Sequence, residues 1–290
     1  MGYDYKPEFA AARGQVITLR VKRLNVPSAK ATSIPLPTLL SGVGVRVTSH
    51  AFDNYPQRLP IFSIISSDPS DGCCPLTYIM VEIPTNAGVN TILLALEVDG
   101  NAGPSFQMAI TDRQPHIVNA CDTIVDTGIC STLVQHADGT FVGFAGYPNG
   151  KLARPGETIT FYAVGLGATD PWVSTGNAAP ASPLAIVVGD LPLIVSYVLP
   201  RPPASPSAPI IWETVKRWIY PSFAGLVPGY VGLYQVNVTL PAELAQAQAS
   251  ATPECEQLTV RIAIGAGSGL GREDIGPMDG ATHVDVCVRP

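Results

Sequence analysis

One strand-like phrase occurs twice in this sequence and limits the fold more than any other feature. The segments YIMVEIP and YQVNVTLP end at Pro84 and Pro241, and each places three apolar residues on one side of an extended chain. A period of two residues is typical of a half-buried β-strand, and proline ends each copy because it has no N–H for a strand ladder. Similar strands precede the copies (VITLRV, TITFYAV) and follow them (NTILLALEV, QLTVRIAIG). The sequence therefore predicts two β domains built on one plan.

Composition agrees with a globular, turn-rich β protein. Hydrophobic residues make up 46% of the 290 residues and charged residues 14%, which is enough apolar material for buried cores. The 27 glycines and 28 prolines have no collagen period, so they indicate many turns between short strands. A net charge of −6 argues against non-specific attraction to nucleic acid or to an anionic membrane. The most apolar stretch, 183–200, is interrupted by Gly189, Asp190 and Pro192, so we expect two strands there and no membrane span.

We expect an all-β protein with two tandem Ig-like β-sandwich domains. The predicted parts are an N-terminal extension (1–11), a first domain (12–118) and a second domain (119–290) that carries a Pro- and Trp-containing insertion (199–222). Helical signal is limited to short insertions at 210–219 and 241–250, which argues against an alternating α/β fold. A hairpin is predicted where Ala137, Asp138 and Gly139 supply the turn. The alternative is one large sandwich in which the repeated phrase is accidental.

Six cysteines favour disulfide bridges, and bridges require an oxidising compartment. They are Cys73, Cys74, Cys121, Cys130, Cys255 and Cys287. We expect one bridge across the short loop CDTIVDTGIC, between Cys121 and Cys130, and one beside the last two predicted strands, between Cys255 and Cys287. The adjacent pair at 73 and 74 leaves open a vicinal bridge or separate partners. A zinc site is the competing interpretation, but no C-x-x-C occurs and the histidines are scattered, so we predict no metal and no cofactor.

No motif for bond chemistry is present in the sequence. A G-x-S-x-G nucleophile elbow is missing, and Ser268 in GAGSGLG follows a predicted strand without the helix that such an elbow requires. The loop acids are either calcium ligands or solvated turn residues, and they comprise Asp68, Asp71, Glu273 and Asp274. We therefore predict no catalytic residue and a protein that is not an enzyme.

Aromatic residues supply the binding hypothesis. The candidate ligand-binding residues are Trp172, Trp212, Trp218 and Tyr220, because exposed aromatic rings stack on sugars or anchor a protein partner. The alternative is that the 199–222 insertion folds back and buries its rings as a lid over one end of the sandwich.

The N-terminal extension supplies an assembly hypothesis. Tyr3, Tyr5 and Phe9 precede the first predicted strand, and we expect this segment to add as a strand to the sheet edge of a neighbouring subunit. The start MGYDYKPEF lacks the basic and apolar regions of a signal peptide. Asn237 opens the sequon NVT but stands within a predicted strand, so we interpret it as structural.

The second half of the chain also resembles a known family. The motifs that carry the likeness are Asp138-Gly139-Thr140, Pro155-Gly156-Glu157, Tyr162 before Gly165-Leu166-Gly167, and then Gly225, Pro228-Gly229, Gly232, Tyr234-Gln235-Val236-Asn237 and Pro241. With PLPTLLSGVGVRV and YIMVEIP upstream, they are similar to the Solibacter-type uncharacterised C-terminal domain family over roughly residues 12–290. The resemblance implies secreted or surface-exposed Ig-like modules of acidobacteria and related soil bacteria, and it implies no catalytic residue. The 199–222 segment and the cysteines depart from the family pattern.

These observations predict an extracellular or cell-surface structural or adhesive module. Its expected partner is itself or another surface protein, and its expected mechanism is surface complementarity and edge pairing of strands. A carbohydrate-binding module that uses the tryptophans to bind a glycan is the first alternative. An enzyme with an unrecognised loop site is the second.

Overall fold

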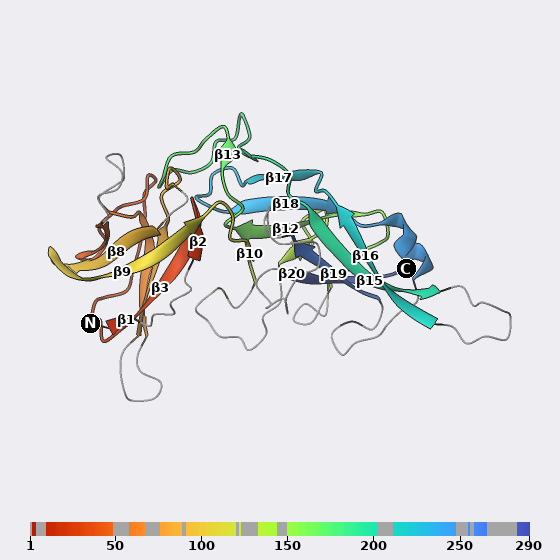
Figure 1. Ribbon diagram of the computed structural model, residues 1–290, viewed down its shortest axis with the longest axis horizontal. Coiled ribbons are helices and arrows are strands. Elements are labelled where there is room, and N and C mark those ends of the chain that lie inside the picture. Colours follow the sequence, from red (N-terminus) through yellow and green to blue (C-terminus); the bar gives the residue numbers. More distant parts are fainter. Residues whose placement is uncertain are drawn as a thin grey trace. The chain divides into compact units, whose positions relative to one another are not determined.

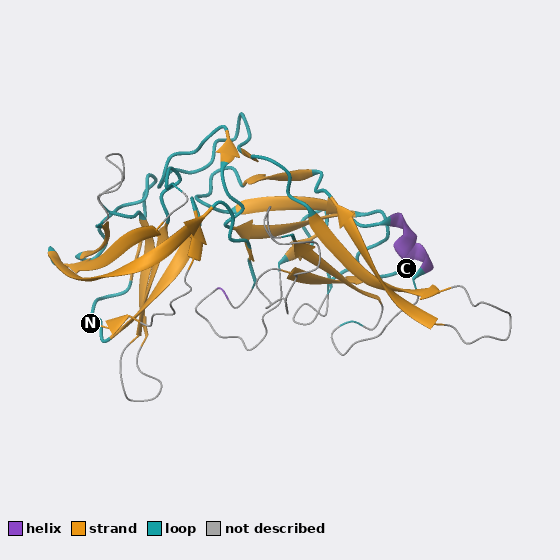
Figure 2. Ribbon diagram, in the orientation of Figure 1, coloured by secondary structure: helices purple, strands orange, loops and turns teal. Residues whose placement is uncertain are grey.

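The computed structural model describes residues 2–3, 10–48, 58–67, 76–88, 91–119, 122, 133–143, 150–201, 211–247, 255, 258–265 and 283–290. Within these residues the protein is built from β-strands, with a short 3-10 helix (Figure 1, Figure 2). The chain divides into two compact units that are interleaved in sequence. The first unit comprises 1–114, 164–188 and 226–233, and the second comprises 115–163, 189–225 and 234–290. The all-β class is confirmed, whereas the tandem Ig-like assignment and the predicted domain limits stay predictions.

Two sheets make up most of the first unit. The five-stranded sheet has the order β1-β3-β7-β6-β4, and the four-stranded sheet has the order β2-β9-β8-β5. The strands are β1 (Gly2–Tyr3), β2 (Ala10–Ala12), β3 (Val16–Lys22), β4 (Ala29–Lys30), β5 (Val43–Val47), β6 (Ile61–Ser67), β7 (Leu76–Glu82), β8 (Thr91–Val98) and β9 (Asn101–Thr111). Neighbours in each sheet are antiparallel, except that β2 runs parallel to β9.

One hydrophobic core joins both sheets of the first unit. In β3 the buried residues Ile17, Leu19 and Val21 alternate with exposed ones, so one face of the strand points inward. The same core cluster draws residues from the other strands of both sheets, including Ile64, Ile79, Val81, Val45, Leu94, Leu96 and Ile110. Burying an aliphatic side chain of this size contributes about 1.5–3 kcal/mol. The apolar residues at alternate strand positions therefore form the hydrophobic contact between the two sheets.

A short antiparallel ribbon also belongs to the first unit. β13 (Thr169–Asp170) pairs with β14 (Ile186–Val187), with Asp170 opposite Ile186. The loop between these strands returns to the end of β7. There the Thr85 N–H donates to Thr175 Oγ1 (3.0 Å), and the Gly176 N–H donates to the Glu82 carboxylate.

The second unit contains a four-stranded sheet of order β16-β15-β19-β20, together with β10, β11, β12, β17 and β18 (Figure 1). The bounds are β10 (His116–Ile117), β11 (Val134–Gln135), β12 (Thr158–Val164), β15 (Leu193–Arg201), β16 (Ile211–Ile219), β17 (Phe223–Leu226), β18 (Tyr234–Thr239), β19 (Leu258–Ile264), β20 (His283–Val288) and the 3-10 helix η2 (Ala242–Gln246). Inward-facing residues on the long strands are fully buried, among them Ile159, Phe161, Val195, Val236, Val238, Val260 and Ile262.

The duplicated phrase forms equivalent strands in the two units. β7 pairs with β3 in the first unit and β18 pairs with β12 in the second, and in both units the next long strand joins the other sheet. The predicted inward face is buried in both copies, at most 1% exposed: Ile79, Val81 and Ile83 in β7 and its end, and Val236, Val238 and Leu240 in β18 and its end.

The turn that enters the first strand pair has a specific set of hydrogen bonds. The Gly14 N–H donates to the Ile83 carbonyl (3.1 Å), and the Ala12 N–H donates to the side-chain oxygen of Gln15 (2.7 Å). Gly14 has a φ of 69°, which favours glycine because other residues carry a Cβ that is crowded there.

The second unit repeats this turn bond for bond. The Gly156 N–H donates to the Leu240 carbonyl (3.1 Å), and the Arg154 N–H donates to the carboxylate of Glu157 (2.8 Å). Gly156 has a φ of 74°. Matching hydrogen bonds at matching positions show that the repeat in the sequence is also a repeat in the structure.

The helical prediction for 210–219 is wrong. Residues 211–219 form β16, which pairs with β15 along all nine of its residues. The apolar positions 211, 215, 218 and 219 have helix-like spacing, but pairing with a long neighbouring strand overrides that local preference. At 241–250 the structure has the five-residue helix η2. The predicted hairpin is present, since Gln135 pairs with Phe141 and Gly139 has a φ of 80° at the turn.

Candidate functional site

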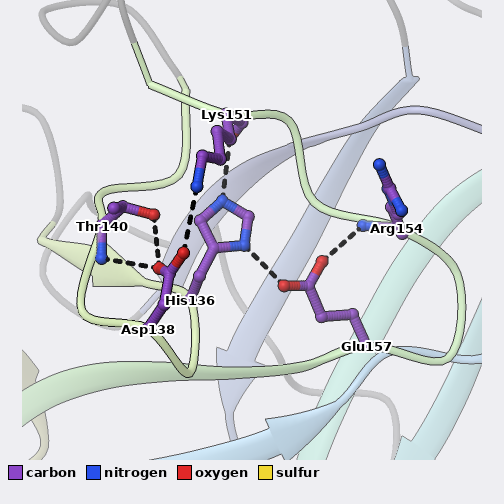
Figure 3. Close-up of polar contacts among 6 residues, drawn as sticks. All are labelled: His136, Asp138, Thr140, Lys151, Arg154 and Glu157. Carbon is purple, nitrogen blue, oxygen red and sulfur yellow. Dashed lines mark hydrogen bonds and ion pairs between the residues drawn. The ribbon is translucent and has the colours of Figure 1, made fainter.

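The region between β11 and β12 gathers a closely connected set of polar side chains (Figure 3). The Nδ1 atom of His136 lies 2.5 Å from Glu157 Oε1, and its Nε2 atom lies 3.0 Å from the Lys151 carbonyl oxygen. Asp138 accepts hydrogen bonds from the Thr140 hydroxyl (2.6 Å), the Thr140 N–H (2.9 Å) and Lys151 Nζ (3.0 Å). These bonds, with the Thr140 hydroxyl as the largest contribution, hold the pKa of the Asp138 carboxyl well below its usual range.

Both ring nitrogens of His136 have hydrogen-bond partners in this cluster. Both partners of His136 are acceptors, whereas a neutral imidazole has a single N–H. Because both ring nitrogens are engaged, His136 has no nitrogen left to accept a proton from a nucleophile, as a Ser–His or Cys–His pair requires.

The cluster gives a structural reason for two of the motifs that carry the family resemblance. Asp138 and Thr140 of the DGT motif fix the hairpin turn through their mutual hydrogen bonds. Glu157 of the PGE motif closes its own turn onto Arg154 and also holds His136. Its equivalent in the first unit is the uncharged Gln15, so the histidine contact is particular to the second unit.

The structure exposes three of the four predicted ligand-binding aromatic residues. Trp172 in the first unit is 57% exposed, and Trp218 and Tyr220 in the second are 43% and 63% exposed. The 199–222 insertion thus does not bury Trp218 or Tyr220. Trp212 lies in β16, where its backbone is paired opposite Pro200.

Trp172 stands on an apolar face that the sequence analysis missed. The β13–β14 ribbon and the residues next to its strand ends expose a set of side chains, here called the ribbon face: Ala168, Asp170, Trp172, Leu184, Ile186 and Val188. The intervening Thr169, Ala185 and Val187 are buried. The Val188 N–H donates to the Ala168 carbonyl (2.9 Å), which continues the pairing of the two strands. One carboxylate therefore stands among five apolar side chains.

Trp218 has neighbours of a different kind. Its row across the four-stranded sheet runs through Ile194 and Ala263 to His283. The next row on the same face consists of Lys216, Ser196, Arg261 and Asp285, because opposed residues of antiparallel strands share a face. We call these two rows the Trp218 face.

The charges on the Trp218 face are arranged in a fixed way. Arg261 donates from Nε and one terminal nitrogen to the two oxygens of Asp285, both at 2.7 Å. Such a bidentate pair orients the guanidinium plane, and the hydrogen bond to Asp285 raises the pKa of Arg261. Lys216 is exposed, and no ion pair to it is found among the described residues. The Trp218 ring reaches Gly265, where an added Cβ would lie 3.1 Å from its Cζ3 atom, and Ile194 and Ala263 in the same row are buried.

Glu82 is a buried acid that the sequence pattern assigned to the outer face of its strand. It is 2% exposed, because the loop that contains Gly176 lies against it. Burial raises the pKa of Glu82 to about 8, against the opposing effect of the Gly176 N–H. No cation pairs with it in the part of the chain that the structure describes.

The remaining predicted site residues fall into two groups. Cys255 and Cys287 are joined in a disulfide, and Tyr3 lies in β1, paired opposite Val21 of the same chain. The others lie outside the described residues, and they are Cys73, Cys74, Cys121, Cys130, Tyr5, Phe9, Ser268, Asp68, Asp71, Glu273 and Asp274. Among the described residues, no group of His, Cys, Asp or Glu is placed to hold a metal ion. In the same residues we find no helix with the length and apolar character of a membrane span.

Comparison with known proteins adds little to this picture. No protein-family model matches the chain, and no curated protein matches it. Among solved structures, the type I pullulanase of Bacillus subtilis strain 168 in complex with maltose is similar at 12% sequence identity, with a TM-score of 0.16. That likeness covers 92% of this chain and 24% of the pullulanase chain. A TM-score of this size supports no conclusion about either fold or function.

The fold and the exposed surfaces therefore define a class and no more than a class. This is an all-β protein with two compact units, a disulfide and several exposed aromatic side chains. The resemblance to the Solibacter-type family stays a prediction.

Proposed function

We propose that this protein is an extracellular or cell-surface adhesive module of the Ig-like β-sandwich type, acting by surface contact without bond chemistry. The observation that carries the proposal is the ribbon face, on which Trp172, Leu184, Ile186 and Val188 are all exposed. Contiguous apolar surface on a soluble protein marks an interaction site. The Cys255–Cys287 disulfide supports an oxidising compartment, as a secreted protein would have.

The chemistry of the ribbon face favours a protein partner over a sugar. Its aliphatic side chains offer dispersion contact and release of water. Asp170 is the one charged residue of the set, and Arg113 donates to the Val188 carbonyl at its end (2.7 Å). Sugar hydroxyls need many polar partners, because a buried hydroxyl without one costs about 1–3 kcal/mol. An aromatic anchor within an apolar surface is instead typical of protein–protein interfaces.

Bead aggregation of the full-length protein tests this proposal. Beads coated with wild-type protein should clump with beads that carry a bacterial surface-protein extract. Trp172→Ala and Ile186→Lys should abolish the clumping, because each removes apolar contact from the ribbon face. Tyr230→Ala is the matched control, since Tyr230 is an equally exposed aromatic residue of the first unit outside that face. Clumping that survives both ribbon-face variants would contradict the proposal.

A carbohydrate-binding function is the second candidate, and the Trp218 face favours it. An exposed indole ring stacks on the apolar face of a sugar ring, and the neighbouring Lys216, Ser196 and Arg261–Asp285 supply donors and acceptors for hydroxyl groups. A glycan array probed with wild-type protein, Trp218→Ala and Trp172→Ala separates the two surfaces. Binding lost only in Trp218→Ala supports this candidate, and an array without any binding counts against it.

A further inference from the structure

β16 is the outermost strand of the four-stranded sheet in the second unit. The strand order is β16-β15-β19-β20, and β16 pairs with β15 from Ile211 opposite Arg201 to Ile219 opposite Leu193 (Figure 1). Among the described residues, no strand pairs with its other side. A nine-residue strand of this kind presents a row of backbone N–H and C=O groups that can pair with another strand.

The sequence of β16 is chemically symmetric about its centre. Read outward from Val215 in IWETVKRWI, each position meets a complementary partner when the strand is laid antiparallel against a copy of itself. The opposed positions are Ile211 with Ile219, Trp212 with Trp218, Glu213 with Arg217, and Thr214 with Lys216. Cross-strand aromatic pairs, aliphatic pairs and pairs of opposite charge each stabilise a sheet by about 0.2–1 kcal/mol.

From this symmetry we infer that β16 is a homodimerisation edge, at which two copies of the chain pair antiparallel about a two-fold axis at Val215. The inference goes beyond the proposed function: the ribbon face of the first unit is the surface that binds the partner protein, whereas β16 of the second unit joins two copies of the chain. The pairing joins the two four-stranded sheets into one continuous sheet. It is isologous, as the interface of a two-fold dimer has to be.

The charges of β16 select this register over its neighbours. Glu213 and Arg217 are exposed, and in the dimer they form two symmetry-related ion pairs. Arg217 donates from Nε to Glu243 (3.3 Å), and its guanidinium group carries further N–H groups that can donate to Glu213 of the second copy. A shift of two residues in one direction places Lys216 against itself, and a shift in the other direction places Glu213 against Val215. A shift of one residue puts the inner face of one copy beside the outer face of the other.

The burial of residues on the inner face of β16 also supports pairing with a second copy. Val215 is opposite Tyr197 and Ile219 is opposite Leu193, and both β15 residues are buried in the core. Val215 and Ile219 themselves are only half-buried, because within the described part of the chain β16 has no neighbouring strand on its other side. In the dimer Val215 meets Val215 of the second copy. The hydrophobic core of the second unit in one copy thereby continues, across the paired β16 strands, into the second unit of the other copy.

Cysteine cross-linking of the full-length protein tests the two-fold axis directly. In Val215→Cys the two introduced thiols face each other, with Cβ atoms about 4.5–5.5 Å apart, so oxidation should give a covalent dimer. Glu213→Cys is the matched control on the same strand and face, because its two copies are four residues apart along the pair, about 13 Å. Peptide mapping by mass spectrometry identifies the bridge between the introduced cysteines. Equal cross-linking of both variants, or none in either, would overturn the inference.

Charge variants give a second test that introduces no thiol. Sedimentation equilibrium of wild-type protein should show a monomer–dimer equilibrium, and Glu213→Arg should raise the dissociation constant about tenfold or more, because two attractive pairs become repulsive. Ser105→Lys, at an exposed position of β9 in the other unit, should leave the constant unchanged. If the protein is a monomer and still clumps beads, the dimer is refuted and the adhesive function is supported. If the protein is a dimer and does not clump beads, the adhesive function is refuted and the dimer is supported.

Discussion

Removing the ionisable group of Glu82 should flatten the pH dependence of stability. The buried carboxyl has a pKa of about 8 in the folded protein, against an ordinary value of 4.5 in the unfolded chain. Between these values the folded state binds more protons than the unfolded state, so the free energy of unfolding falls as pH rises. The stability from this group is fully present below about pH 4.5 and is lost as the pH rises through about 8.

The size of this effect follows from the separation of the two pKa values. At 1.36 kcal/mol for each pKa unit, the full separation corresponds to about 5 kcal/mol. Most of this loss occurs between about pH 5 and pH 9. Water that reaches the carboxylate by local opening of the Gly176 loop reduces it, so we expect about 2–4 kcal/mol over that range.

Urea unfolding of wild type and Glu82→Gln at pH 5, 7 and 9 measures this difference. Glutamine keeps the size of the side chain and an oxygen that accepts the Gly176 N–H, but it does not titrate. The two proteins should be similar at pH 5, and the variant should be about 2–4 kcal/mol more stable at pH 9. Parallel stability profiles over the whole range would refute the reasoning.

Glu97 provides the matched control for this experiment. It is also buried, but Arg58 donates to both of its oxygens, at 3.1 and 2.7 Å, and these bonds lower its pKa. Its stabilising contribution is therefore lost as pH falls, below the range of the experiment. Glu97→Gln should shift stability by the same amount at pH 5, 7 and 9.

Three further expectations concern stability. Replacing Cys255 and Cys287 together by serine should cost about 3–4 kcal/mol, given a sequence separation of 32 residues, and unchanged urea unfolding would contradict this. Phe161→Ala, at a fully buried position, should cost about 3–5 kcal/mol in the same assay. Gly165→Ala should lower the melting temperature far more than Gly100→Ala. Both glycines have positive φ, but at position 165 the added Cβ would meet a backbone oxygen at 2.1 Å, and at position 100 it meets nothing within 4 Å.

The faces of the long strands were predictable from the sequence, and the reason is visible in β7. Ile79 and Val81 alternate with polar or larger residues, so their pattern alone identifies the inward side. The segment LAIVV at 184–188 has no such contrast, because apolar residues occupy both faces. Its outward apolar face was therefore invisible until the structure showed which alternate residues are buried.

Burial decided by distant segments was also beyond sequence reasoning. Glu82 follows the outward parity of β7, yet a loop more than 90 residues later covers it through Gly176. The residues 226–233 likewise belong to the first unit. There an added Cβ on Gly232 would lie 2.7 Å from the Val16 side chain, so only glycine permits this approach. A local sequence pattern does not predict such contacts, because they depend on tertiary packing.

The failed helix prediction for β16 has a physical reason that bears on the dimer. Apolar residues at 211, 212, 215, 218 and 219 satisfy a helical period because they occupy both faces of the strand. An ordinary edge strand has no partner for apolar residues on its outer face, and it usually carries charged residues or proline that prevent pairing with another strand. In β16 the charges are instead placed at positions that match each other across a two-fold axis, so they permit one self-pairing and oppose its neighbours. The pattern that imitates a helix is thus the pattern expected of a strand that associates with its own copy.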